Sequence, residues 1–167
     1  VLLSDFSFEK PSYSILKQIN QDCFYNLEFS NYNAILHITY LPLKENLLEH
    51  IEGSRNLAYK HDMMADAISE SVYINDEYRV YGLLYDYEGV TASAVQFYLT
   101  DSMNHFFRGA LYFNTEVTDS LLPINNFLKA DIPRYDKFYT HPPSRSKFRL
   151  IKLAVEGATP QKQSLLG

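Results

Sequence analysis

Apolar and polar residues alternate along the first third of the chain. The runs from Cys23 to Phe29 and from Ala34 to Leu41 each repeat with a period of two residues, the period of a β-strand with one buried face. The polar residues 30–33 between them predict a turn, so the two runs are expected to pair as an antiparallel hairpin. The preceding segment FSFEKPSYSI also alternates but contains Pro11, which favours an edge or irregular strand.

The period then changes to that of a helix. Beginning at Glu45 or Asn46, apolar residues recur at steps of three and four, which predicts an amphipathic helix. The apolar positions are Leu47, Leu48, Ile51, Leu57 and Ala58. Gly53 lies inside this helix at a cost of about 1 kcal/mol relative to Ala. A close approach of the helix to a sheet would explain that glycine, and so would chance.

From Ser71 the period of two returns and continues to Phe113. Polar turns at 75–77, 88–89 and 101–104 divide this stretch into strands, and because the turns are short, neighbouring strands must be antiparallel. A second helix is expected after Asp119, a suitable N-cap residue, with Pro123 in its first turn. The pattern therefore predicts a meander followed by a helix.

This order of elements predicts an α+β fold in which two main helices pack on an antiparallel sheet of about 5–7 strands. By analogy it resembles the sandwich of the PsbP and Mog1 proteins, which mostly bind other proteins. We expect one domain over residues 1–167, with a core at about 6–132. Residues 133–167 form a C-terminal extension, in which FRLIKLAV could add an edge strand.

Composition and charge narrow the function classes. The chain has 15 Lys and Arg against 20 Asp and Glu, a formal net charge of −5, so nucleic acid is not expected as a partner. Cys23 is the single cysteine, which excludes an intrachain disulfide. No run approaches the roughly 18–20 apolar residues that cross a bilayer. Fourteen tyrosines and no tryptophan favour half-exposed sheets and protein-contact surfaces.

Motifs for catalysis are absent from the sequence. It contains no GxSxG elbow, no Ser-x-x-Lys and no phosphate-binding glycine loop. His61 and Asp66 offer two ligands where a metal site needs three or four. We therefore expect no catalytic residue, no cofactor and no metal. The alternative, a small-molecule- or metal-binding envelope enzyme, would use His61, Asp66, Asp86 and Asp101.

Polar and aromatic residues on the strands are the remaining candidates. Arg108 alternates onto the face of Phe106, Ala110 and Tyr112, where it could stack on a tyrosine, pair with an acid such as Asp101 or recognise a partner. The tyrosines of the meander are either covered by helices or form a contact surface. The residues predicted to contact a partner are Arg55, His61, Tyr85, Asp86, Gln96 and Arg108.

Several distinctive sequence motifs of this chain are similar to those of the gliding-motility-associated lipoprotein family GldD of the Bacteroidetes. They are SRNLAYKH (54–61), ADAI (65–68), VYGLLYDYEG (80–89), VQFYLTDS (95–102) and HFFRGALYFN (105–114). The resemblance runs from roughly Phe8 to Ile132 and does not include the tail. It implies a non-catalytic lipoprotein of the outer membrane that faces the periplasm and supports gliding and type IX protein secretion. Its partners would be other envelope proteins, and it would meet the membrane only through an N-terminal lipid anchor upstream of Val1.

Overall fold

A computed structural model describes residues 6–8, 10–19, 23–60, 65–76, 79–89, 91, 93–115, 119–131, 138–140 and 161–163. Within them, the main sheet is antiparallel and has the strand order β10-β5-β6-β7-β8-β4-β3-β2. Its strands are β2 (Ile15–Gln18), β3 (Phe24–Phe29), β4 (Ala34–Pro42), β5 (Ala67–Asn75), β6 (Val80–Glu88), β7 (Ser93–Thr100), β8 (His105–Phe113) and β10 (Gln161–Gln163). The predicted hairpin is β3–β4, and the predicted meander is β5 to β8.

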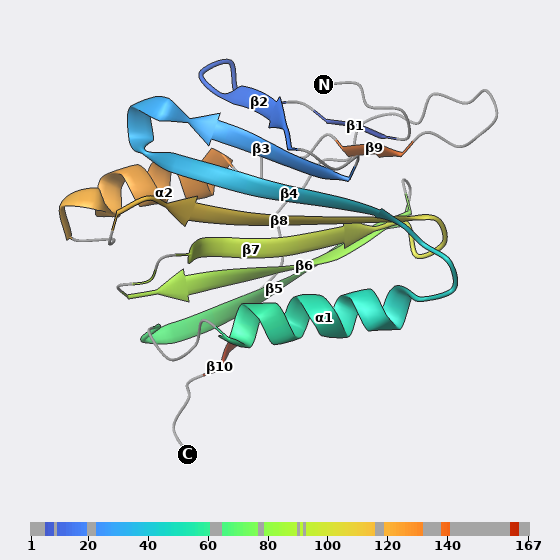
Figure 1. Cartoon of the computed structure of the whole chain (residues 1–167). Coiled ribbons are helices and arrows are strands. Elements are labelled where there is room, and N and C mark those ends of the chain that lie inside the picture. The colour runs from blue at the N-terminus through green and yellow to red at the C-terminus, as the bar shows by residue number, and fades with distance from the viewer. Residues whose placement is uncertain are drawn as a thin grey trace.

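The hairpin and the meander join along β4 and β8. These strands pair antiparallel over nine residues, from Ala34 opposite Phe113 to Pro42 opposite His105. β4 therefore lies beside the last strand of the meander, although α1 (Leu47–Lys60) and three strands separate the two along the chain. This pairing makes one continuous sheet from the two parts (Figure 1).

Two helices pack on opposite faces of this sheet (Figure 1). α1 covers the face on which Tyr85, Gln96, Ala110 and His37 follow one another across β6, β7, β8 and β4, and we call this the α1 face. α2 (Leu122–Asp131), preceded by the 3-10 turn η3 (Asp119–Leu121), covers the other, the α2 face. The predicted α+β fold with two main helices is thus confirmed, while the likeness to PsbP and Mog1 remains a prediction.

The larger hydrophobic core lies on the α2 face. Leu128 of α2 is 1% exposed and packs with the strands, and Ile124 and Leu121 pack at the edge of the same core. The strand residues of this core come from both the hairpin and the meander. They include Tyr25, Leu27, Phe29, Leu36, Ile38, Val80, Val95, Phe97, Leu99, Phe107, Leu111 and Phe113. These positions alternate along each strand, as the period of two predicts.

The contact between α1 and the sheet depends on small residues. Ser54 and Ala58 are its buried positions, whereas two residues expected on the apolar stripe, Leu48 and Leu57, are 68% and 39% exposed. The small side chains let the helix lie close to the sheet while larger apolar neighbours point outward. Gly53 does not mark that approach, because a Cβ atom built there would have no atom within 4 Å.

The two ends of the chain add short strands. β1 (Phe6–Phe8) pairs antiparallel with β9 (Phe138–Thr140) in a separate two-stranded sheet. β10 pairs with residues 68–70 of β5 and so forms an edge of the main sheet. The run FRLIKLAV, in which an edge strand was expected, lies outside the described residues, and the single-domain organisation remains a prediction.

Candidate functional site

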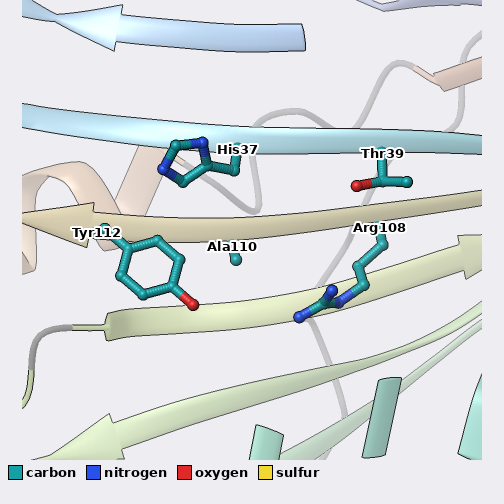
Figure 2. A pocket seen from close by; sticks show the side chains of 5 residues that line it. All are labelled: His37, Thr39, Arg108, Ala110 and Tyr112. Carbon is teal, nitrogen blue, oxygen red and sulfur yellow. The ribbon is translucent and has the colours of Figure 1, made fainter. Parts of the chain in front are cut away.

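A pocket of about 320 Å³ opens on the α1 face, where β4 and β8 lie side by side (Figure 2). It is lined by His37, Thr39, Arg108, Ala110 and Tyr112, and we call it the Arg108 pocket. Thr39 pairs with Arg108 and His37 pairs with Ala110, so these side chains point to the same side of the sheet. The hollow exists because the methyl group of Ala110 lies between two long side chains of the same strand.

Arg108 supplies the charge of this pocket. Its Nη2 donates a hydrogen bond to Oε1 of Gln96 at 2.9 Å. Burial lowers the pKa of the guanidinium, and the neighbouring Tyr112 and Tyr87 act in the opposite direction. An arginine nevertheless stays protonated in proteins. Among the described residues Arg108 makes no ion pair, and the predicted pairing with Asp101 does not occur.

His37 forms the opposite wall, on β4. Its Nδ1 lies 2.7 Å from Oδ1 of Asn26, an oxygen that can only accept, so Nδ1 carries the proton of the neutral ring. The ring meets Tyr112 edge-on, with 5.4 Å between the ring centroids. Burial lowers the pKa of His37, which favours the neutral ring at neutral pH.

This lowered pKa gives a prediction for stability against pH. In the unfolded chain His37 is protonated near pH 6.5, which is about the pKa of a free histidine side chain. In the folded protein it is protonated only at lower pH. Stability should therefore fall as the pH drops through and below this point. Urea midpoints between pH 7.5 and 5.0 should decline less in His37→Gln than in the wild type. If the urea midpoints of the two proteins declined equally, the lowered pKa of His37 in the folded protein would be contradicted.

Of the predicted contact residues that the structure describes on the α1 side of the sheet, apart from Arg108, two are buried and one is exposed. Tyr85 and Gln96 are each 1% exposed, so any part they take in partner binding would be indirect. Arg55 is exposed on α1 and lies over the ring of Tyr59, with its Cζ 5.7 Å from the centroid. Tyr59 in turn donates a hydrogen bond to Oε1 of Glu70 at 2.6 Å. Arg55 therefore lies next to the contact that Tyr59 of α1 makes with Glu70 of β5.

Tyrosines on the α1 face fall into two groups. Tyr85 and Tyr87 are buried, and Tyr87 donates its hydroxyl to the carbonyl oxygen of Ala58 on α1 at 2.9 Å. Burial raises the pKa of both tyrosines. Tyr98 and Tyr112 are only half-buried. The helix thus buries Tyr85 and Tyr87 of β6, whereas Tyr112 of β8 stays partly accessible in the Arg108 pocket.

The contact residue Asp86 lies on the α2 face. It accepts a 2.5 Å hydrogen bond from Nζ of Lys129 on α2, which also reaches the carbonyl oxygen of Tyr87 at 2.9 Å. Asp86 and Arg108 are therefore on opposite faces of the sheet and cannot belong to one patch. His61 lies outside the described residues.

The carboxylates of the alternative enzyme do not converge. Asp86 pairs with Val95, and Asp101 follows six residues later along β7, a separation of roughly 20 Å at about 3.3 Å per residue. Asp66 lies against Gly89 at the opposite end of the meander from Asp101. The described part of the chain contains no group of three or more His, Cys, Asp or Glu that could hold a metal ion.

Asp101 has a structural role instead. Its Oδ1 accepts hydrogen bonds from the backbone N–H groups of Met103, Asn104 and His105 at 3.0, 2.8 and 2.9 Å, which closes the turn between β7 and β8. We predict that Asp101→Ala lowers the free energy of unfolding by about 1–2 kcal/mol. Asp101→Asn keeps an acceptor oxygen and should recover most of this loss in urea denaturation. Equal stability of Asp101→Ala and wild type would contradict the role.

A comparison with family models identifies the chain. The sequence model of the gliding motility lipoprotein GldD family matches residues 3–135. The chain belongs to this family. No curated protein and no solved structure matches it. The family resemblance of the sequence motifs is thereby confirmed, and every residue of the Arg108 pocket lies within the matched residues 3–135.

Membership in the GldD family sets the broad function. The chain belongs to a family of gliding motility lipoproteins, and a lipoprotein is held at a membrane by its lipid. GldD is not a known enzyme family. In the described residues no helix is both long and apolar enough to span a membrane.

Sequence reasoning found Arg108, Ala110 and Tyr112 as one face of β8, but it missed His37 and Thr39 as their neighbours. The alternation along β4 does place both residues on the same face of that strand. The missing information was the pairing of β4 with β8, which no local pattern indicates.

Proposed function

We propose that this domain faces the periplasm as a non-catalytic lipoprotein domain. In this role it supports gliding motility and type IX protein secretion by contacting other envelope proteins. Membership in the GldD family supports the link to gliding. The contact role is supported by the surface that α1 leaves uncovered on its own face of the sheet.

That uncovered surface is the observation that carries the proposal. A helix is about 10 Å wide, whereas eight strands at about 4.8 Å spacing span roughly 34 Å. α1 packs against β6, β7 and β8, and no described helix covers β3 and β4 on this face (Figure 1). Phe24, which pairs with Thr39 of the Arg108 pocket, is 38% exposed there, and Ile15 on β2 of the same face is 53% exposed. Exposed apolar side chains beside a charged pocket are typical of contact surfaces.

The test uses the full-length, lipidated protein in its host. Ile15→Asp combined with Phe24→Asp places two charges on the uncovered surface without touching the core. We expect the double variant to lose co-purifying envelope proteins after mild cross-linking, and to impair gliding and secretion of type IX substrates. Its melting temperature should stay within a few degrees of the wild type.

Leu48→Asp is the matched control. Leu48 is 68% exposed on the outer side of α1, so the same kind of charge is introduced away from the uncovered surface. We expect this variant to keep its partners and to glide. A double variant that retains the same partners and activity as Leu48→Asp would refute the proposal.

A further inference from the structure

The described residues leave the guanidinium of Arg108 without a counter-charge. The two ion pairs among them join Lys17 to Glu28 and Lys129 to Asp86. The partner of Arg108 is the neutral amide oxygen of Gln96. The chain as a whole has 20 acidic residues against 15 basic ones, so acidic side chains are not scarce. A half-buried guanidinium of this kind is stabilised most by an anion, and its planar fork matches a carboxylate.

We propose that the Arg108 pocket binds the side-chain carboxylate of an acidic residue on a partner protein. This inference rests on the proposed function, because it names the chemistry of the contact made by the uncovered surface. The other occupants to consider are a phosphate group, a lipid headgroup and a carboxylate of this chain itself.

The surroundings of Arg108 hold its guanidinium in place for such a ligand. The hydrogen bond to Gln96 engages one of the five N–H donors of the arginine. Gln96 is itself 1% exposed and pairs with Ala110, so the guanidinium is anchored to a buried amide oxygen. Figure 2 shows the guanidinium and the hydroxyl of Tyr112 extending from β8 to the same side, with Ala110 between them. The incoming group would lie over the methyl group of Ala110.

Charge and shape favour a carboxylate over a phosphate. Within the pocket Arg108 contributes one positive charge, and the lowered pKa of His37 favours its neutral ring at neutral pH. One positive charge matches the single charge of a carboxylate better than the charge of about −1.5 to −2 on a phosphate group. A volume of about 320 Å³ is at the lower end for small-molecule pockets. Exposed Phe24, paired with Thr39 of the pocket, can receive an apolar neighbour of the acidic residue.

The direct test is an NMR titration of the full chain with three probes. They are a capped Leu-Glu-Leu peptide, its Leu-Gln-Leu counterpart and inorganic phosphate. We expect the glutamate peptide to shift the Nε–H signal of Arg108 and the backbone amides of Thr39 and Ala110. Its dissociation constant should be at least tenfold lower than that of the glutamine peptide and of phosphate.

Variants separate charge, shape and fold. Arg108→Gln removes the charge, and Ala110→Leu fills the floor of the pocket while keeping the charge. Each should weaken glutamate-peptide binding at least tenfold, and Arg108→Lys several-fold because it loses the fork. Arg55→Gln, which removes an exposed arginine of α1 outside the pocket, should bind within twofold of wild type. Melting temperatures verify that each variant is folded, and Ala110→Leu tests the pocket even if Arg108→Gln destabilises the protein.

Three results would overturn the carboxylate assignment. They are equal binding of the glutamate and glutamine peptides, tighter binding of phosphate, and Arg108 shifts that occur only with vesicles containing anionic lipid. An absence of shifts with every probe would also overturn it, and would be the result if an acid of this chain occupied the pocket. If Arg108→Gln and Ala110→Leu keep the envelope partners that the Ile15 and Phe24 double variant loses, the pocket assignment fails and the proposed function stands.

Discussion

Replacing Tyr85 by Ala is expected to lower the free energy of unfolding by about 3–5 kcal/mol, because it removes a large ring from a packed site. Tyr85 is 1% exposed and packs with Ala58, Ile68 and Tyr87 between α1 and the sheet. Its ring also meets that of Tyr59 edge-on, with 6.1 Å between the centroids. Urea denaturation measures the loss, and binding of envelope proteins should fall only together with folding.

Tyr85→Phe is the matched control for this prediction. It keeps the ring and removes only the hydroxyl, which makes no hydrogen bond to a described residue. Its stability should therefore lie within about 1 kcal/mol of the wild type. If Tyr85→Ala were as stable as the wild type yet failed to bind partners, Tyr85 would act at the surface, and its assignment to the core would be wrong.

Local patterns predicted most of the elements because each pattern is set by nearby residues. The period of two located β3, β4 and the meander, and the period of three to four located α1. β5 begins at Ala67, four residues earlier than the pattern showed, because the consecutive polar residues Ser69, Glu70 and Ser71 interrupt the alternation after Ile68. Within α1, the buried positions are small residues, whose burial hydrophobic periodicity does not reveal.

The strand order could not be predicted in the same way. β4 pairs with β8 across a long stretch of chain, and only this pairing brings His37 and Thr39 beside Arg108. Alternation assigns a residue to one face of a strand but does not say which strand lies next to it. A pocket that uses two distant strands is therefore invisible in the sequence, even when every residue that lines it is visible.

The extent of helix cover was the second unknown. Tyr85 and Arg108 both alternate onto the α1 face, yet Tyr85 is buried beneath α1 and Arg108 remains half-exposed. Alternation treats the two positions alike because it carries no information about where a single helix lies on a wide sheet. The sequence motifs VYGLLYDYEG and HFFRGALYFN thus contain buried residues and partly exposed residues side by side.

Gly82→Ala is the second change with a large expected effect. Gly82 lies in β6 opposite Leu99 of β7, and a Cβ atom added there would lie 2.3 Å from the backbone oxygen of Tyr98 and 2.7 Å from Cδ2 of Leu99. The oxygen belongs to the neighbouring strand and cannot move without disturbing the pairing of β6 with β7. We expect the free energy of unfolding to fall by about 3 kcal/mol, as for severe overpacking of a core.

Gly53→Ala makes the same chemical change at a site with open space. A Cβ atom at Gly53 in α1 would meet nothing within 4 Å, so this variant should gain about 0.5–1 kcal/mol from the higher helix propensity of alanine. Opposite signs for the two variants in urea denaturation would show that β6 and β7 approach too closely for a methyl group. A Gly82→Ala protein as stable as Gly53→Ala would contradict that approach and the register that produces it.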